Sequence, residues 1–380
     1  MKLFVPKELA SDETRAPMLP VDVGKLSKVG AEIEVEAGIG RALSIADEQY
    51  EQAGAKVSDQ RGRSLAAADV VLRLSVPRTE EIQDLAAGCI HISHMDPFNE
   101  ADVVKELATR KISGISLEMI PRTTIAQKMD VISSQANLAG YAAVLLAATH
   151  QQRIFPMMMT PAGTIPPARV FVIGAGVAGL QAIATAKRLG ARVDAFDVRP
   201  EAQDQITSLG AKPLKIDLGE TGQTKDGYAK KLTDEQLDKQ RAAMAKQCAQ
   251  SDVVITTAKV FGRKAPLIVT NDMLDGMKPG STVVDLAVET GGNVEASKLG
   301  KEVERKGVTI IGYPELQRRV PLAASQMFSS NLYNLVEHFW DKEAKRFELK
   351  RDDEIIEGCL ITHDGEIVND TIRAAITKGA

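Results

Sequence analysis

Three closely spaced glycines, followed at a set distance by a carboxylate, are the residues of this sequence that most directly indicate chemistry. Gly174, Gly176 and Gly179 form the pattern G-x-G-x-x-G, and Asp197 lies 18 residues after the third glycine. Glycine at these positions permits a tight turn, lets the backbone approach a pyrophosphate, and lets the next helix pack closely. A carboxylate at this distance can accept hydrogen bonds from the ribose hydroxyls of an adenosine. The spacing predicts a dinucleotide site; the alternative is a plain tight turn in an α/β sheet.

The charge of Asp197 favours NAD(H) over NADP(H) at this site. A carboxylate beside the ribose repels a 2′-phosphate. Arg199 follows two residues later in the sequence, and its positive charge can offset that repulsion. The sequence therefore predicts NAD(H) as the cofactor and keeps NADP(H) as the alternative.

The residues around the glycines must form a strand, a turn, a helix and a second strand. An apolar run at 170–173 enters the turn, a helical pattern of apolar residues spans 180–189, and a second apolar run ends at Asp197. This is the structural context in which the glycine pattern binds a dinucleotide. Further strands of the same sheet are expected at 252–256, 282–286 and 308–312.

The first part of the chain shows the same alternation of short apolar segments and helical patterns. Strands are expected at 3–5, 32–36, 69–74, 89–93 and 112–116, and helices at 21–30, 47–54 and 99–111. Such alternation is typical of a mostly parallel sheet covered by helices. No glycine-rich turn of the phosphate-binding kind occurs here, so we expect an α/β domain without its own nucleotide.

Two long helices and a hairpin indicate how the chain divides. Residues 124–150 have the pattern of one helix rich in small side chains, 320–340 that of a second, and 359–368 that of a β-hairpin with Asp-Gly at its turn. A chain of 380 residues is long enough for two domains. We expect an α/β fold of two Rossmann-like domains with parallel sheets, joined by the two long helices with a cleft between. The first is discontinuous, residues 1–132 plus 320–380, and the Rossmann domain that binds the nucleotide is residues 133–319.

Composition and short motifs exclude several other classes. A net charge of −4 argues against nucleic acid or anionic lipid as a partner. No apolar run approaches the roughly 20 residues of a membrane span, and the N-terminus lacks a signal-peptide pattern. Three cysteines without ligand spacing indicate ordinary thiols. His91 and His94 point to roughly opposite faces of a strand end, so no metal site is expected.

Several longer stretches carry a resemblance that covers almost the whole chain. They are Pro6-Lys7-Glu8, Glu13-Thr14-Arg15, and residues 119–141, 157–160, 255–258 and 285–293. With these stretches the sequence resembles the NAD(H)-binding α1 component, or domain I, of proton-translocating NAD(P) transhydrogenases, relatives of the alanine dehydrogenases. The resemblance implies that NAD(H) binds here and that a separate partner component holds NADP(H). Hydride would pass directly from NADH to NADP⁺, as in a Si–Re specific transhydrogenase.

The same resemblance implies partners and a location. A membrane component of the transhydrogenase would couple hydride transfer to proton translocation, and the chain would be a homodimer. It would lie in the cytoplasm, attached peripherally to the cytoplasmic membrane through its partners.

Site residues can be transferred to this sequence from the family pattern. A loop at the nicotinamide end would contain the catalytic residues Arg122, Gln127, Asp130 and Ser133. The expected cofactor-binding residues are Thr123, Thr124, Ile125, Gly174, Gly176, Val177, Gly179, Asp197, Val198, Arg199, Gly227, Tyr228, Gln240, Ala258 and Lys259. Gly227 and Tyr228 lie within a polar segment, 218–228, that would be a mobile flap or a plain surface loop. The alternative for the first four is that they are polar residues at a helix start, with Thr123 or Thr124 as N-cap.

Hydride transfer between two nicotinamides moves no proton, so the site requires orientation rather than a general acid or base. An alanine dehydrogenase would instead need cations for a substrate carboxylate and groups that move a proton. Arg15 and His94 match two positions of that pattern, but Ser75 replaces its lysine and Glu289 replaces its aspartate. The dehydrogenase therefore remains the first alternative, and a non-catalytic NAD-responsive regulator the second.

Overall fold

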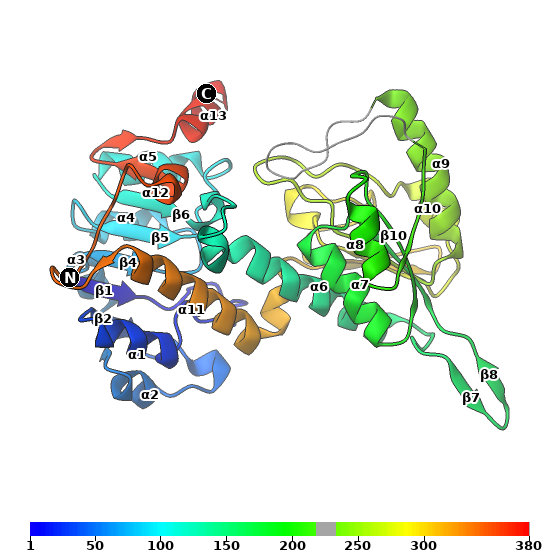
Figure 1. The fold of residues 1–380 in the computed structure, drawn as a ribbon, viewed down its shortest axis with the longest axis horizontal. Helices are drawn as coiled ribbons and strands as arrows, with labels where there is room; N and C mark the ends of the chain where they lie inside the picture. The colour runs from blue at the N-terminus through cyan, green and yellow to red at the C-terminus, as the bar shows by residue number, and fades with distance from the viewer. Residues whose placement is uncertain (218–232, 380) are drawn as a thin grey trace. The chain divides into compact units, whose positions relative to one another are not determined.

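The chain folds into two compact units in a computed structural model that describes residues 1–217 and 233–379 (Figure 1). Unit 1 consists of Met1–Gln135 and Val320–Ala380, and unit 2 of Ala136–Arg319. The blue-to-cyan start of the chain and its orange-to-red end contribute to the same unit in Figure 1. Unit 1 is therefore built from two segments that are far apart in the sequence.

Unit 1 contains an eight-stranded sheet in the order β19-β18-β6-β5-β4-β1-β2-β3. All pairs from β3 through β6 are parallel, and they follow the strand order of a doubly wound dinucleotide-binding fold. The strands are β1 (Lys2–Val5), β2 (Glu32–Glu36), β3 (Lys56–Ser58), β4 (Val70–Leu72), β5 (Ile90–Ser93), β6 (Ser113–Ser116), β18 (Leu360–His363) and β19 (Glu366–Ile367).

Helices lie on both faces of this sheet because its strands are apolar on both sides. Leu3 and Val5 of β1 belong to one buried cluster, whereas Phe4 between them belongs to another. The helices of unit 1 are α1 (Pro20–Lys28), α2 (Asp47–Gln52), α3 (Arg61–Ala66), α4 (Thr79–Asp84), α5 (Ala101–Thr109), α11 (Pro321–His338), α12 (Glu354–Cys359) and α13 (Asp370–Gly379). Phe328 and Leu332 of α11 are fully buried in the same cluster as Leu3. The late segment thus supplies part of the core around the first strand.

The predicted C-terminal hairpin is confirmed. β18 pairs antiparallel with β19, and Asp364 and Gly365 at the turn have φ of 49° and 93°. Two successive residues with positive φ are what a type I′ hairpin turn requires. β18 also pairs antiparallel with β6, so the hairpin extends the sheet of unit 1.

Unit 2 contains a seven-stranded sheet in the order β11-β10-β9-β12-β13-β15-β14, in which only the pair β14·β15 is antiparallel among the described strands. Its strands are β9 (Arg169–Ile173), β10 (Arg192–Phe196), β11 (Lys212–Pro213), β12 (Val253–Thr256), β13 (Thr282–Asp285), β14 (Lys301–Arg305) and β15 (Val308–Gly312). Its helices are α7 (Val177–Arg188), α8 (Ala202–Ser208), α9 (Asp234–Gln250) and α10 (Asn271–Asp275). Val170 and Val172 of β9 face one core and Phe171 and Ile173 the other. The predicted α/β class with two Rossmann-like sheets is confirmed.

The prediction of one helix over residues 124–150 is wrong at its start. A short 3₁₀ helix, η3 (Ala126–Met129), comes first, and α6 (Val131–His150) begins only after Asp130. Asp130 has an extended backbone with ψ of 94°, and its carboxylate accepts hydrogen bonds from the N–H and hydroxyl of Ser133 at 2.9 and 2.6 Å. This is how an aspartate N-cap begins a helix. Periodicity could not reveal the break because apolar residues continue across it.

α6 is the one helix in the described residues that is long and apolar enough, by length and composition, to cross a membrane. Half of its apolar window is buried inside the protein. Ala142, Ala143 and Ala147 lie in a core cluster of unit 2 together with Val170. Burial of this kind is typical of a core helix, and a single such helix is weak evidence for a membrane span.

Two helices of unit 2 approach each other with no side chain between their backbones. A Cβ placed on Gly140 of α6 would lie 2.1 Å from the carbonyl oxygen of Ala178 in α7. Atoms at that distance overlap, and backbone cannot shift as a flexible side chain does. Gly140 therefore determines how closely α7 packs on α6.

We predict that Gly140→Ala lowers the free energy of unfolding by about 1–3 kcal/mol, because the added methyl overpacks a backbone contact. The usual gain in helix propensity from glycine to alanine, about 1 kcal/mol, would point the other way. Gly62→Ala is the matched control, since a Cβ there would lie 3.8 Å from its nearest neighbour, a side-chain oxygen of Asp84. Urea unfolding of the three proteins gives the comparison. Equal stabilities of Gly140→Ala and Gly62→Ala would contradict the packing argument.

Candidate functional site

The glycine turn lies between β9 and α7 and leaves the N-terminus of α7 open. Gly174 has φ of +96°, a conformation that favours glycine. A Cβ on Gly176, the N-cap of α7, would meet nothing within 4 Å, whereas one on Gly179 would lie 1.9 Å from the carbonyl oxygen of Gly174. Gly179 thus permits the close packing of α7, and Gly176 exposes backbone at the helix end.

This helix end is suited to a negatively charged group. α7 is 12 residues long, and no acidic residue lies in its first turn. The unpaired N–H groups and the positive end of the helix dipole attract phosphate. The helix follows β9, which lies between β10 and β12 where the strand order of the sheet reverses. Ligands of open α/β sheets bind outside the carboxyl ends of the strands at such a point.

Asp197 lies just past the end of β10, beside the glycine turn, but its carboxylate already has partners. One oxygen, Oδ2, accepts a hydrogen bond from the N–H of Ala175 at 2.7 Å. The guanidinium of Arg199 donates to both oxygens at 2.9 Å. The structure therefore brings Asp197 and Arg199 together as an ion pair at the predicted adenosine end, an arrangement that the sequence indicated only as two nearby charges.

Ala258 and Lys259 follow β12 at the same edge of the sheet. The hydroxyl of Thr257 donates to the carbonyl oxygen of Gly174 at 3.1 Å, so the loop touches the glycine turn. Lys259 forms an ion pair with Glu289 at 2.7 Å. Of the remaining predicted residues in unit 2, Val177 begins α7 and is 40% exposed, and Val198 is partly buried at the end of β10.

A buried polar pair that sequence reasoning missed holds this loop. The side-chain amide of Asn293 accepts from the N–H of Ala258 at 3.0 Å and donates to its carbonyl oxygen at 2.9 Å. Asp285, fully buried at the end of β13, accepts from the N–H of Asn293 and the hydroxyl of Thr256. The signal in the sequence was an aspartate at a strand end followed by two glycines and an asparagine.

Gln240 lies on α9 and is 8% exposed. Its Oε1 has no hydrogen-bond partner among the described residues. A buried, unsatisfied oxygen is what a side chain awaiting a ligand would show. Gly227 and Tyr228, and the expected flap around them, lie outside the described residues.

The predicted catalytic loop lies in unit 1, between β6 and α6. Arg122, Thr124 and Gln127 have exposed side chains, and Ile125 is 56% exposed. Thr123 is partly buried and accepts from the N–H of Gln127 through its carbonyl oxygen at 3.1 Å. The structure brings the loop residues together on one segment.

Two buried side chains and one helix fix this loop in place. Ala126 and Met129 are fully buried in the core of unit 1. The carbonyl oxygen of Lys128 accepts hydrogen bonds from Asn331 and Asn334 of α11 at 2.9 and 3.2 Å. These two asparagines are positioning residues that the sequence alone did not indicate. Asp130 and Ser133 cap α6, so the N-cap of this helix is Asp130 rather than the expected threonines.

The residues that match the dehydrogenase pattern are held by carboxylates of unit 1. Arg15 makes a bidentate ion pair with Glu13, at 2.8 and 2.6 Å, and donates to Gln135 at 3.1 Å. His94 lies 3.3 Å from Glu118. Burial raises the pKa of the Glu118 carboxyl, but His94 and the other hydrogen-bond donors outweigh this and bring it to about 2. An incoming carboxylate would have to displace Glu13 to reach Arg15.

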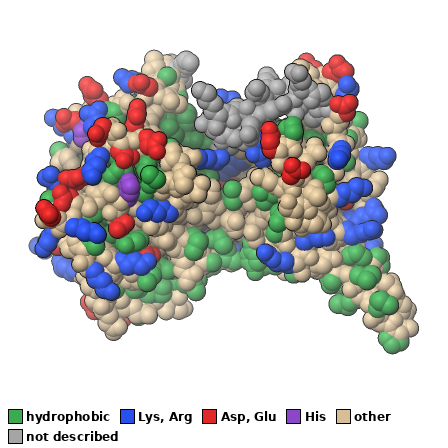
Figure 2. Space-filling view, viewed as in Figure 1, with side chains coloured by type: hydrophobic (Ala, Val, Ile, Leu, Met, Phe, Trp, Pro, Cys, Tyr) green, Lys and Arg blue, Asp and Glu red, His purple; other side chains and the backbone are tan. Residues whose placement is uncertain are grey.

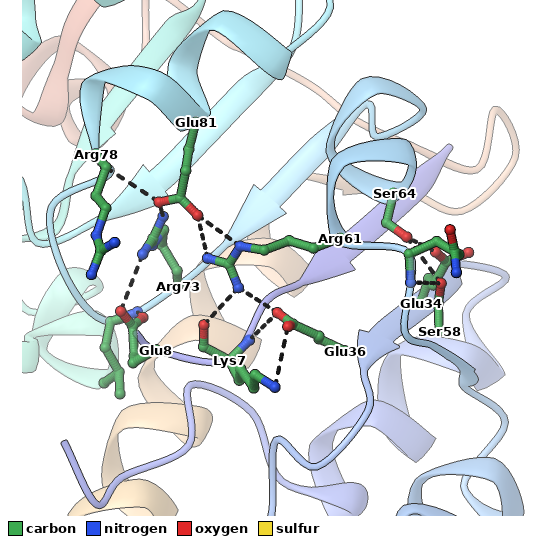
Figure 3. Close-up of polar contacts among 12 residues, drawn as sticks. Lys7, Glu8, Glu34, Glu36, Ser58, Arg61, Ser64, Arg73, Arg78 and Glu81 are labelled. Carbon is green, nitrogen blue, oxygen red and sulfur yellow. Dashed lines mark hydrogen bonds and ion pairs between the residues drawn. The ribbon is translucent and has the colours of Figure 1, made fainter. Parts of the chain in front are cut away.

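The edge of unit 1 that corresponds to the glycine turn is filled by ion pairs (Figure 3). Its strand order reverses between β1 and β4. Glu8, which follows β1, accepts from the N–H groups of Leu74 and Ser75 after β4 and pairs with the buried Arg73 at 3.2 Å. Arg73 also pairs with Glu81 at 2.9 Å, as Figure 3 shows. The protein's own carboxylate thus occupies the place of an anion.

Histidine and cysteine contribute no evident chemistry in the described residues. No group of three or more His, Cys, Asp or Glu side chains there could hold a metal ion. His91 is fully buried, and burial together with Arg73 lowers its pKa to about 3. The three cysteines are buried free thiols, and burial raises the pKa of each to about 12.

The ion pairs of unit 1 predict a specific loss of stability in acid. Burial raises the pKa of Glu81, but Arg73 and Arg61 lower it more strongly, to about 2 from an ordinary 4.5. The unfolded chain therefore takes up a proton at a higher pH than the folded protein does. The stabilising contribution of Glu81 is complete above about pH 4.5 and is lost as the pH falls toward 2.

We predict that Glu81→Gln lowers the free energy of unfolding at pH 7 by about 1–3 kcal/mol, because two arginines lose a charged partner. The difference from the unchanged protein should shrink between pH 4.5 and pH 2. Glu80→Gln is the control, since Glu80 is adjacent and exposed. Urea unfolding at several pH values tests this; a difference that is independent of pH would refute the ion-pair explanation.

The chain is similar to known proteins in sequence along almost its whole length. Residues 4–139 match the alanine dehydrogenase/PNT N-terminal domain family, and residues 143–370 match the alanine dehydrogenase/PNT C-terminal domain family. The chain is 43% identical over 376 residues to the first part of NAD(P) transhydrogenase subunit alpha of Rhodospirillum rubrum, covering 97% of this chain and 98% of that protein. It is 38% identical over 367 residues to NAD(P) transhydrogenase subunit alpha of Haemophilus influenzae, covering 96% of this chain and 71% of that protein.

Solved structures show the same fold. A crystal structure of transhydrogenase from Sinorhizobium meliloti superposes with a TM-score of 0.87 at 43% identity, covering 97% of this chain and all of that one. An L-alanine dehydrogenase structure superposes with a TM-score of 0.82 at 22% identity over the full length of both chains. The second similarity concerns the fold alone.

Proposed function

Because the chain belongs to the family of NAD(P) transhydrogenase α subunits, we propose that it binds NAD(H) and passes hydride directly from NADH to NADP⁺ on a separate component. Oxidoreductase chemistry of the transhydrogenase type follows from membership of the family. The direct transfer, its Si–Re stereochemistry and its coupling to proton translocation by a membrane component are parts of the proposal.

One observation carries this proposal: the two units share a strand order, but only one has an edge that can receive a phosphate. In unit 2 the N-terminus of α7 is open at Gly176. In unit 1 the corresponding edge is filled by Glu8 and Arg73. Exchange of hydride between two nucleotides requires two sites, and the described residues offer one. The second nucleotide, NADP(H), would therefore be held by the partner component.

The proposed roles of the site residues follow from this division. Gly174, Gly176 and Gly179 receive the pyrophosphate of NAD(H), and Asp197 binds the adenosine ribose. Further contacts to the cofactor are assigned to Thr123, Thr124, Ile125, Val177, Val198, Arg199, Gly227, Tyr228, Gln240, Ala258 and Lys259. Arg122, Gln127, Asp130 and Ser133 orient the nicotinamide. Of these, Gln127 has an exposed amide that can hold a carboxamide.

An alanine dehydrogenase is disfavoured by the pairing of its expected substrate residues. The guanidinium of Arg15 is held by Glu13, and His94 by Glu118. Ser75 offers no positive charge where that pattern has a lysine. Binding a substrate carboxylate would lack one cation and would have to break the ion pair of the other.

Three further parts of the proposal extend from the family. The chain lies in the cytoplasm and is attached peripherally to the cytoplasmic membrane through its NADP(H)-binding and membrane partners. Residues 1–132 with 320–380 and residues 133–319 are its separately folding domains. Two copies of the chain form a homodimer through an exposed apolar hairpin of unit 2.

We predict that the chain exchanges hydride between NADH and an oxidised NADP analogue only when the NADP(H)-binding component is added. Gln127→Asn should slow this exchange at least about tenfold, a loss of about 1.4 kcal/mol in the transition state, with less effect on NADH binding. Stopped-flow absorbance measures the exchange, and NADH fluorescence measures the binding. Gln83→Asn, at another exposed glutamine of unit 1, is the control.

Three outcomes would count against this assignment. Rapid oxidation of NADH by the chain alone with pyruvate and ammonia would favour the dehydrogenase. Binding of NADH without any exchange in the presence of the partner would favour an NAD-responsive regulator. Equal losses of binding and exchange in Gln127→Asn would show that Gln127 only anchors the cofactor.

The proposed dimer surface is a two-stranded hairpin of β7 (Met158–Thr160) and β8 (Gly163–Ile165) that belongs to no larger sheet. Met159 is 76% exposed, Met158 47% and Ile165 43%. Figure 2 shows hydrophobic side chains along this hairpin, which Figure 1 labels. A cavity of about 330 Å³, lined by Phe155, Pro156 and Leu189 among others, lies at its base. An isolated hairpin is marginally stable in water, so contact with a second copy would stabilise it.

We predict that Met159→Lys raises the dimer dissociation constant at least about tenfold, because an unpaired charge would be buried in the interface. Leu299→Lys is the control, since Leu299 is 57% exposed in unit 2 away from the hairpin. Sedimentation over a range of concentrations measures the association. A dissociation constant that Met159→Lys leaves unaltered would exclude the hairpin as the interface.

A further inference from the structure

The carboxylate of Asp197 has no remaining capacity for a ligand. Oδ1 accepts from the N–H of Arg199 and from its Nε, both at 2.9 Å. Oδ2 accepts from the N–H of Ala175 at 2.7 Å and from Nη2 of Arg199 at 2.9 Å. A carboxylate offers about four lone-pair positions, and all of them are used by these four donors.

This saturation conflicts with the role that Asp197 has in the proposed function. The two ribose hydroxyls of an adenosine would each need a lone pair of this carboxylate. The donors from Ala175 and from the Arg199 backbone are fixed by the turn and by the chain direction. The two guanidinium bonds are the ones that can be released, because the side chain of Arg199 is 20% exposed and that of Asp197 only 8%.

The guanidinium is held in place from a second direction. Nη2 of Arg199 also donates to the carbonyl oxygen of Ala175 at 3.2 Å, within the glycine turn itself. The positive charge therefore lies between the adenosine end of the site and the turn that would receive the pyrophosphate. Hydrogen bonding and the charge of Asp197 raise the pKa of Arg199, so it stays charged.

We propose that Arg199 is a specificity-determining residue that competes with the adenosine ribose for Asp197 and is displaced when NAD(H) binds. This inference rests on the proposed function. The displacement lowers the affinity for NAD(H), because two charge-assisted bonds are exchanged for bonds to the ribose. The same pairing prevents Arg199 from serving as an anchor for a 2′-phosphate, so Asp197 excludes NADP(H) both by its own charge and by holding the nearby cation.

Two substitutions separate the two halves of this proposal. Arg199→Gln removes the competitor, so the dissociation constant for NADH should fall about two- to tenfold, with no gain for NADPH. Asp197→Asn removes the charge that holds Arg199, so NADH binding should weaken while NADPH binding improves at least about threefold. Arg199→Lys keeps the charge without the two parallel bonds and should be intermediate for NADH.

Fluorescence titration of the full chain with NADH and with NADPH measures all of these constants. Arg192→Gln is the control, since Arg192 is an exposed arginine at the opposite end of the same strand, β10. Thermal unfolding of each variant establishes that it is folded. An NADH dissociation constant that is unchanged or higher in folded Arg199→Gln overturns the competition. Unimproved NADPH binding by Asp197→Asn overturns the exclusion of NADP(H).

Failure of the underlying function would look different. If the unsubstituted chain bound neither NADH nor NADPH, the nucleotide site itself would be refuted. If it bound NADH but never exchanged hydride with the partner, only the transhydrogenase reaction would fail, and the competition at Asp197 would still be measured.

Discussion

Contact between backbones at the first turn of α7 is the constraint on which the site depends. Gly179 packs against the carbonyl oxygen of Gly174, and Gly140 of α6 packs against Ala178, each leaving no room for a Cβ. These contacts fix where the N-terminus of the helix ends relative to the carboxyl edge of the sheet. The N–H of Ala175 then reaches Asp197, and Thr257 reaches Gly174. The phosphate position, the ribose carboxylate and the β12 loop therefore follow from one steric arrangement.

Sequence reasoning predicted the parts of the fold that depend on long apolar patterns. The strands of both sheets, the glycine turn and the terminal hairpin have apolar periodicity or turn residues that identify them. The strands β3 and β11 were missed because, with three and two residues, they carry no recognisable period. The break at Asp130 was missed because a single side chain, bonded to Ser133, ends one helix and begins the next.

The candidate site was predictable in its residue types but not in its pairings. Asp197 and Arg199 were recognised as opposing charges, yet only the structure shows that they saturate each other. Asn293 could not be assigned from the sequence, because its role depends on the buried Asp285 and on contact with Ala258, 35 residues away in the chain. Side-chain partnerships between distant segments are set by packing, which local patterns do not report.

The discontinuous unit 1 has a consequence for the order in which the protein matures on the ribosome. Its first strand needs Phe328 and Leu332 as neighbours, and β6 needs β18, whose residues end at His363. All of unit 2, by contrast, has been synthesised once Arg319 has been added. Domains that are continuous in the chain fold in the order in which they emerge. In this protein the later-starting unit can complete its fold first, while the N-terminal strands wait for the last sixth of the polypeptide.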